Sequence, residues 1–127
     1  MKKLEAYSGQ AYAVLRIVAG AMFAFHGAQK LFGVLGAPQP PLVSQMGLGG
    51  IVEFFGGLAI ALGVGTRWAA FFCSGEMAVA YIQFHWKLAF DSNFFPAVNH
   101  GELAVLYCFV FLMIACRGSG RWSLGKD

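Results

Sequence analysis

The sequence predicts an all-α membrane protein: a four-helix transmembrane bundle with both termini cytoplasmic, built as a single domain over residues 1–127. Three observations support this fold class. Of the 127 residues, 58% are hydrophobic and only 12% are charged, whereas a soluble domain is about 25% charged. Four apolar segments each approach the roughly 20 residues that cross a bilayer as a helix. Basic residues gather on one side of these segments, as is typical of cytoplasmic loops.

The four predicted spans cover residues 12–33, 48–65, 68–86 and 98–116. The proline-rich stretch 36–41 separates the first span from the second, because a helix cannot continue through it. Gly65-Thr66-Arg67 joins the second span to the third in a turn so short that it predicts a helical hairpin. Residues 91–96 are polar at one end and aromatic at the other, which is typical of a loop on the bilayer surface.

The first apolar segment follows Met1-Lys2-Lys3, as the apolar region of a signal peptide would. It is interrupted by Arg16, is too long for such a region and lacks a cleavage site, so it is predicted to stay as the first span. Loop charges then set the orientation. One side carries Lys2, Lys3, Arg67, Arg117, Arg121 and Lys126. The other side has Lys87, which nearby Asp91 offsets, and we therefore expect both termini in the cytoplasm.

Ionisable residues inside the spans are the candidates for function, because a charge at a span centre costs about 2.5–3.5 kcal/mol and is normally turned toward the bundle interior. With a rise of about 1.5 Å per residue, His26 and Glu53 lie about 6 Å, and Glu102 about 7 Å, to the outer side of their span midpoints. Glu76 falls near the midplane. Only Arg16 lies in the inner half, within reach of the cytoplasmic surface by snorkelling.

The sequence therefore predicts one polar pocket in the outer half of the bundle, open to the outside. Its candidate catalytic residues are His26, Glu53 and Glu102. Its candidate ligand-binding residues are Arg16, Lys30, Glu76, His85, Asn99 and His100.

Many aromatic residues flank these positions, and together with buried His and Glu they suit a flat, lipid-soluble ring. A quinone requires apolar walls and a proton-exchanging His or carboxylate near its carbonyl groups. In this hypothesis His26 or Glu102 transfers protons, while Lys30 or Arg16 stabilises a reduced, anionic ring. The chain contains no haem, flavin or Fe–S motif, so electrons would come from a redox partner protein or directly from substrate.

Two other functions fit the same residues. The buried charges can be interhelical ion pairs that hold together a non-enzymatic membrane subunit or assembly factor. Alternatively, the pocket binds or transports a small apolar metabolite or a metal ion, which with four helices would require a homodimer. Gly56, Gly57 and Gly63 could permit the close helix contacts within or between protomers.

Other chemistry is disfavoured. His and Glu on facing helices can bind a transition metal, but there is no Glu-x-x-His pair, and His100 and Glu102 diverge by about 200° on a helix. We predict no metal site. Cys73, Cys108 and Cys116 form neither a CxxC pair nor a zinc pattern and are interpreted as packing residues. The net charge of +3 is small and lies mainly at the chain ends, so no nucleic-acid partner is expected.

Several stretches, taken in order, resemble the DoxX family over nearly the whole chain. They are LRIVAG at 15–20, FHGAQKLFG at 25–33, EFFGGL at 53–58, LGVGTRWAA at 62–70, the positions Met77, Ala80, Tyr81 and His85, FPAVNHGE at 95–102, and GSGRWSL at 118–124. DoxX-like proteins are four-helix proteins of the bacterial inner membrane, described as oxidoreductase or quinol-oxidase-associated subunits, with relatives linked to thiosulfate:quinone oxidoreduction and to quinone or thiol stress.

The resemblance implies an inner-membrane location and a quinone-linked role. The family's polar positions correspond to Arg16, His26, Lys30, Glu53, His85, Asn99 and Glu102, whereas Glu76 fits that pattern less clearly. The tail departs from the pattern, because Gly125 follows Leu124 where an Asp is expected in many relatives. A tail-specific interaction is therefore not carried over.

Overall fold

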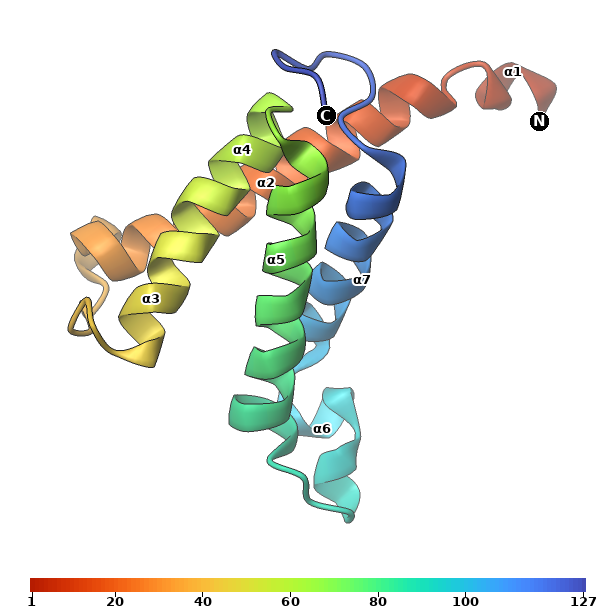
Figure 1. Ribbon diagram of the computed structural model, residues 1–127. Helices are drawn as coiled ribbons and strands as arrows, with labels where there is room; N and C mark the ends of the chain where they lie inside the picture. Colours follow the sequence, from red (N-terminus) through yellow and green to blue (C-terminus); the bar gives the residue numbers. More distant parts are fainter.

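The computed structural model describes residues 1–127 and contains helices and loops only (Figure 1). Its long helical stretches are α2 (Ser8–Phe32), α3 (Gln45–Ile51) running through η2 (Val52–Gly56) into α4 (Gly57–Leu62), α5 (Thr66–Ala80) running into η3 (Tyr81–Trp86), and α7 (Glu102–Arg117). Its short elements are α1 (Lys2–Glu5), η1 (Val34–Gly36), η4 (Ser92–Phe94) and α6 (Pro96–Asn99).

Each predicted span coincides with a long helical stretch, and the boundaries differ where glycine or a left-handed residue breaks the helix. The second stretch ends at Leu62 rather than 65, because Gly63 adopts φ +74°. The predicted span 98–116 is divided: α6 stops at Asn99, His100 has φ +60°, and α7 begins at Glu102. Two helices, Ser8–Phe32 and Gln45–Leu62, are long and apolar enough to cross a membrane.

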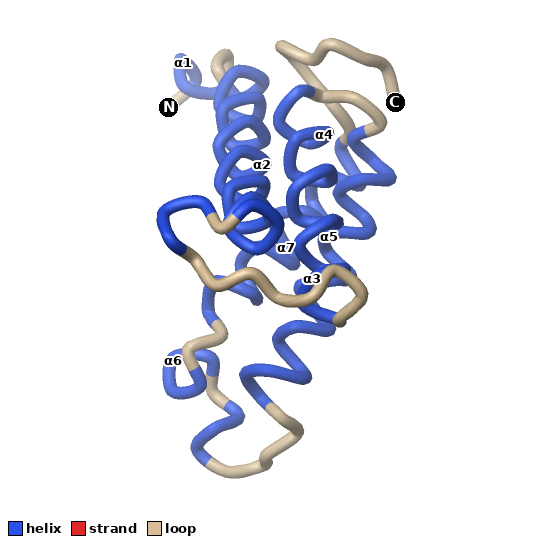
Figure 2. The backbone as a smooth tube through the Cα atoms, turned by 90° about the vertical axis from the view of Figure 1, so that its left-hand side faces the viewer, coloured by secondary structure: helices blue, strands red, loops and turns tan.

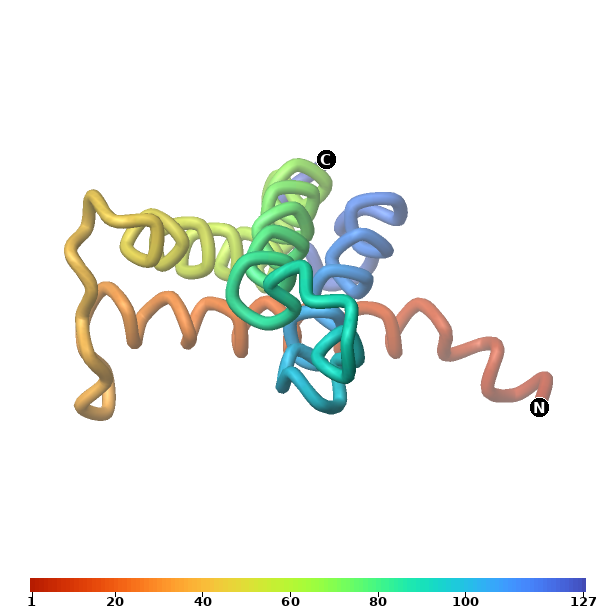
Figure 3. The backbone as a smooth tube through the Cα atoms, turned by 90° about the horizontal axis from the view of Figure 1, so that it is seen from below, coloured from red at the N-terminus to blue at the C-terminus, as the bar shows by residue number.

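The long helices form two antiparallel pairs that lie across each other. The helix α2 packs along α3, η2 and α4, and α5 packs along α7. Seen from below, α2 and the α3–α4 stretch run across the view while α5 and α7 rise out of it (Figure 3). The pairs converge near the α4–α5 turn and diverge toward α3 and α6 (Figure 1). This crossing leaves one end of the assembly tightly packed and the other end open.

The first pair owes its closeness to glycine. A Cβ added to Gly20, Gly27 or Gly57 would lie 2.6, 2.3 or 2.4 Å from a backbone nitrogen of the facing helix. No side chain can occupy these positions unless the backbones separate. Of the glycines predicted to allow close contact, Gly57 does so within this pair, and Gly56 faces the Cys73 sulfur of α5. The small residues thus act within one chain.

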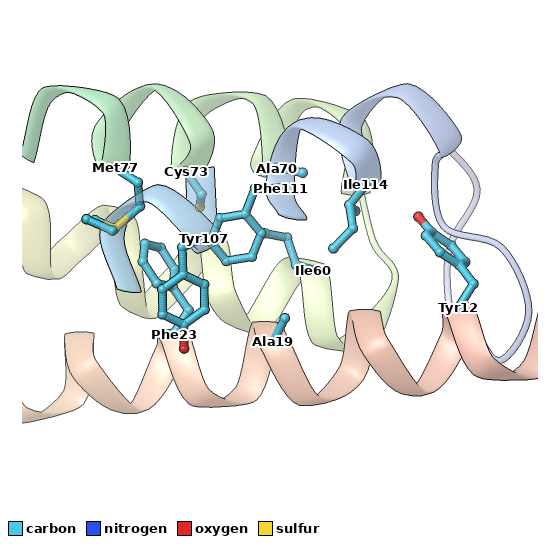
Figure 4. Close-up of a cluster of buried hydrophobic side chains, with 11 residues drawn as sticks. Tyr12, Ala19, Phe23, Ile60, Ala70, Cys73, Met77, Tyr107, Phe111 and Ile114 are labelled. Carbon is cyan, nitrogen blue, oxygen red and sulfur yellow. The ribbon is translucent and has the colours of Figure 1, made fainter. Parts of the chain in front are cut away.

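Buried hydrophobic side chains fill the space where the pairs converge (Figure 4). Phe23 of α2 contacts Phe111 of α7 with ring centroids 4.7 Å apart and Tyr107 at 5.1 Å. Ile60 of α4 is fully buried against the same cluster. Large apolar residues also cover the outside, for example Leu106 and Phe109 on α7. Such a continuous apolar exterior suits a lipid environment and not water.

Both chain ends lie at the same end of the molecule as the α4–α5 turn (Figure 2), and the C-terminus is the one beside that turn (Figure 1). The tail folds back along this turn, and the backbone N–H groups of Leu124 and Gly125 donate to the carbonyls of Leu62 and Gly63 at 2.9 and 3.1 Å. The Arg67 guanidinium donates to carbonyls in the last turn of α7, including that of Cys116 at 2.6 Å. The termini are therefore on one side of the helices.

Candidate functional site

A cavity of about 670 Å³ lies between the helix pairs at the end where they diverge. Side chains from both pairs line it, and most of its wall is apolar, including Phe23, Met77 and Phe84. Its polar lining residues are His26, Lys30, Gln45, Glu53, Glu76, His85, His100 and Tyr107. Six of the nine site residues predicted from the sequence therefore meet in one cavity, and Arg16, Asn99 and Glu102 do not line it.

An ion pair between α2 and η2 forms one wall. The Lys30 ammonium lies 2.6 Å from Oε1 of Glu53, whose residue surface is only 4% exposed. The second carboxylate oxygen of Glu53 is buried and has no hydrogen-bond partner. A buried acceptor without a partner is costly, so this oxygen is available for a donor that enters the cavity.

Glu76 of α5 supplies a second carboxylate to the same cavity. Its Oε2 atom is buried without a partner, and its Oε1 atom approaches Gly49, where an added Cβ would lie 2.8 Å away. Glycine at position 49 therefore lets the carboxylate reach the α3 backbone. Two carboxyl groups share this cavity with one lysine. The Lys30 ammonium donates to one Glu53 oxygen, and one oxygen of each carboxyl group is left without a donor.

Two π-helical turns, η2 and η3, border the cavity from opposite pairs. The first carries Glu53, and the second carries Phe84 and His85. A π-helical turn widens the helix by one residue and shifts the direction of its side chains, and such turns are frequent at functional sites. Here they direct a carboxylate and an imidazole into the space between the pairs.

Histidine and tyrosine side chains form the remaining polar wall. The His26 ring lies edge-on to Tyr107, with centroids 6.5 Å apart. The Tyr107 hydroxyl is buried without a partner and points toward α2 (Figure 4). On η3, His85 stacks on Tyr81, and its Nδ1 lies 3.2 Å from the Asn99 carbonyl oxygen. Tyr107 can therefore donate a hydrogen bond to a ligand with no competing protein partner.

Asn99 lies beside the cavity and shapes its rim. Its side-chain amide donates to the Asn93 carbonyl at 2.9 Å and to the Tyr81 hydroxyl at 3.2 Å, and its oxygen accepts from the Gly101 N–H at 2.8 Å. These bonds fix the left-handed turn at His100, which places that residue on the cavity wall. Asn99 is thus positioned to hold the loop and not to touch a ligand.

Arg16 is far from the cavity and fully buried at the end that holds the termini. Its guanidinium donates to the carbonyls of Ile60 and Ala61 at 2.7 and 2.8 Å, and to those of Arg121 and Trp122 at 3.1 and 3.0 Å. The sequence predicted that Arg16 would snorkel to the surface, and this is wrong. The tail covers the guanidinium and supplies two of its acceptors. The structure separates Arg16 from the other predicted ligand-binding residues.

Glu102 is exposed in the first turn of α7 and does not line the cavity. The sequence placed it by depth alone, and the break at His100 and Gly101 sets the rotation that turns it outward. A carboxylate at a helix N-terminus is stabilised there by the helix dipole, which gives Glu102 a local role. Glu102, which the sequence predicted to transfer protons to a ligand, therefore lies outside the cavity.

The arrangement offers hydrogen-bond donors and acceptors to an apolar ligand. Donors are available from Lys30 and Tyr107, acceptors from Glu53 and Glu76, and either from His26. No three His, Cys, Asp or Glu side chains come close enough together to hold a metal ion. The cavity can therefore orient a ring that carries oxygen substituents and exchange protons with it.

Sequence comparison identifies the family. The DoxX family model matches residues 11–86. The chain belongs to the DoxX family. The match runs from α2 to the end of η3 and so includes His26, Lys30, Glu53, Glu76 and His85, five of the polar residues that line the cavity. DoxX is a family of membrane proteins, in agreement with the apolar exterior.

Two relatives align with almost the entire DoxX-family chain. An uncharacterized protein of Haemophilus influenzae is 39% identical over 98% of this chain and 95% of its own length. The inner membrane protein YqjF of Escherichia coli is 32% identical over 99% of this chain and 95% of its own length. No solved structure gave a significant match.

Sequence reasoning overlooked two contributors to the site. Tyr107 was recognised as one of many aromatic residues, but nothing in its neighbourhood indicated that its hydroxyl is buried and unpartnered. Gln45 lies in the loop before the second predicted span, and only the start of α3 at that residue brings it to the cavity. The π-helical turns η2 and η3 had no sequence signal.

Proposed function

We propose that this DoxX-family protein is a four-span protein of the bacterial inner membrane with both termini in the cytoplasm, and that it binds a quinone in the cavity between its helix pairs. It would act as a quinone-linked oxidoreductase or as the quinone-binding subunit of one. The observation that carries the proposal is the largely apolar 670 Å³ cavity with unpartnered polar atoms on Glu53, Glu76 and Tyr107.

The orientation follows from charge and from the arrangement of the ends. Both ends of the chain lie on one side of the helices (Figure 2), and the basic residues Lys2, Lys3, Arg117 and Arg121 lie near them. Positive loops favour the cytoplasmic side. The cavity would then face the outer half of the membrane. The name of the Escherichia coli relative supports an inner-membrane location.

In this proposal a quinone ring lies between the aromatic side chains Phe23, Phe84 and Tyr107. Tyr107 and Lys30 donate hydrogen bonds to carbonyl oxygens, and His26 exchanges protons with a ring oxygen, because an imidazole can act in both directions near neutral pH. Reduction by two electrons adds two protons to the ring, and Glu53 and Glu76 accept hydrogen bonds from the hydroxyl groups so formed. Electrons come from a partner redox protein or directly from substrate, since the sequence has no motif for a redox cofactor of its own.

The proposal is tested by titrating purified protein in lipid nanodiscs with a tailless benzoquinone and following the quenching of intrinsic fluorescence. We expect saturable binding that His26→Ala and Tyr107→Phe each weaken about tenfold, the value of one hydrogen bond of about 1.4 kcal/mol. Glu5→Gln, an exposed carboxylate outside the cavity, is the matched control and should bind normally. Absence of saturable binding to folded wild-type protein would refute the proposal.

The Lys30–Glu53 ion pair favours a second candidate, a non-enzymatic membrane subunit whose buried charges fix helix packing. It joins α2 to η2 at 2.6 Å, as an interhelical tie would. In that case substitutions at these residues would lower thermal stability, and no quinone concentration would raise the melting temperature. A rise in melting temperature on adding quinone, as expected for a ligand that binds only the folded state, distinguishes the two candidates.

A further inference from the structure

A second hollow lies on the outside of the molecule, where α2 passes α7. This groove holds about 190 Å³, and all eight of its lining side chains are hydrophobic. From α2 it takes Val18 and Met22, and from α7 it takes Leu106 and Val110. Nothing in it can form a side-chain hydrogen bond except the Tyr107 hydroxyl at its edge. The groove is therefore suited to hydrocarbon alone.

The groove adjoins the cavity. Leu103 and Tyr107 line both of them. A molecule in the cavity thus meets an apolar exit beside these two residues. Along α2, the groove residues Val18 and Met22 precede the cavity residues His26 and Lys30, so the path leads from the polar wall toward the middle of the helix.

The helices α2 and α7 meet beside this groove through side chains and not through their backbones. The helix α2 touches α7 at few positions, whereas glycines bring α2 and α4 into backbone contact. Val18, Met22 and Leu106 are exposed along the groove. In a bilayer these side chains would face lipid, and helices there associate by close packing of small residues. No glycine brings the backbones of α2 and α7 together, so the groove between their side chains can accept an apolar chain.

We propose that the groove between α2 and α7 holds the hydrocarbon tail of the ligand whose ring occupies the cavity. The site would then take lipid-tailed rings that enter sideways from the bilayer. This inference rests on the proposed function. The commitment to the ligand's own tail, and not to a separate lipid or a second copy of the chain, rests on the position of the groove next to the cavity, with Leu103 and Tyr107 lining both.

Two variants test it with a matched control. Val18 lines the groove and Val14 does not, yet both are on α2 and both are 49% exposed. Val18→Trp fills the groove, while Val14→Trp adds the same bulk one helical turn away. Binding is measured in nanodiscs with a benzoquinone that has no tail and with the same ring bearing a decyl tail. A third probe carries a photoreactive diazirine at the end of the decyl tail.

We expect Val18→Trp to weaken the decyl quinone about tenfold through steric exclusion and to leave the tailless quinone unchanged. Val14→Trp should change neither. The diazirine should label residues 15–22 and 103–110, and excess tailless quinone should abolish this labelling. Equal effects of both tryptophans on the decyl quinone, or labelling spread over all apolar helices, would overturn the groove assignment while tailless binding still supports the proposed function. Failure of the tailless ring to bind would overturn both.

Discussion

Two regions of this protein bury polar side chains in an apolar setting, and the regions differ in how many of the buried polar atoms have hydrogen-bond partners. At the end with the chain termini, Arg16 is 0% exposed, and its terminal guanidinium nitrogens donate to four backbone carbonyls. At the other end, Glu53, Glu76 and Tyr107 keep buried oxygen atoms without partners. Both regions carry the cost of burying polar groups. The first recovers much of that cost within the protein itself, although the Arg16 Nε atom and the Thr66 hydroxyl there are also buried without a partner.

The difference indicates which buried polar group serves the fold and which can serve a ligand. The terminal guanidinium nitrogens of Arg16 tie α2, α4 and the tail together and have no N–H group left for a ligand. The cavity residues are the reverse, because their free atoms lie beside a space large enough for a small molecule. Residue type alone does not distinguish Arg16 from Glu53 and Glu76, since all three are ionisable residues in predicted spans.

Arg16→Met should produce the largest loss of stability. It removes all four hydrogen bonds and leaves two carbonyls of α4 and two of the tail without this donor. We expect the free energy of unfolding to fall by about 4 kcal/mol, as when one side of a buried charged network is removed. Thermal unfolding in detergent measures it, with exposed Lys3→Met as control. A loss no larger than that of the control would show that Arg16 is not a structural tie.

Lys30→Met should have the next largest effect. It leaves the Glu53 carboxylate buried without its cation, at a cost of about 3 kcal/mol, the low end for broken buried pairs because the Lys30 side chain is 24% exposed. The double variant Lys30→Met/Glu53→Leu should recover most of that stability, since no charge remains unpaired. If the double variant is less stable than the single one, the ion pair is not the main interaction at this position.

Glu76→Gln should hardly change stability, because the Glu76 Oε2 atom has no hydrogen-bond partner to lose. The melting temperature should stay equal to that of the wild type or rise, and the free energy of unfolding should change by less than about 1 kcal/mol. Binding of the tailless benzoquinone should nevertheless weaken, as measured by the same fluorescence titration. A large loss of stability with normal binding would place Glu76 with Arg16 and not with the cavity.

The smallest effect concerns the tail. Burial raises the pKa of Asp127, but the Ser119 N–H and the Arg67 guanidinium outweigh it and hold the pKa below its usual value of 3.8. A lowered carboxyl pKa contributes stability that is present at pH 7 and is lost as the pH falls through the folded-state pKa. Melting curves from pH 7 downward should therefore show a small acid-induced loss below the usual value, absent in Asp127→Asn.

The helical architecture could be predicted because span length, loop charge and turn residues are local signals. His26 and Glu53 could be expected in one pocket from their depth along each helix, since rise per residue is constant, and both line the cavity. The four-span topology and its orientation stay predictions, because two of the helices meet the length and apolarity that a span requires.

Rotation about each helix axis could not be predicted in the same way. Glu102 has the expected depth but faces outward, because a left-handed turn at His100 resets the helix that follows. The π-helical turn η2 changes the direction of Glu53 by a local rearrangement that composition does not signal. The partners of Arg16 include Arg121 and Trp122, whose backbone position depends on how the tail folds back.

The partners of Arg16 also set an order in time. Two of its acceptors lie 44 and 45 residues further along the chain, and the other two lie 105 and 106 residues further. At about 5–20 residues per second of synthesis, the last acceptors leave the ribosome about 5–20 s after the arginine. During that interval the Arg16 guanidinium lacks two of its four carbonyl acceptors. The tail, although it is synthesised last, therefore completes the hydrogen bonding of an arginine in the first long helix.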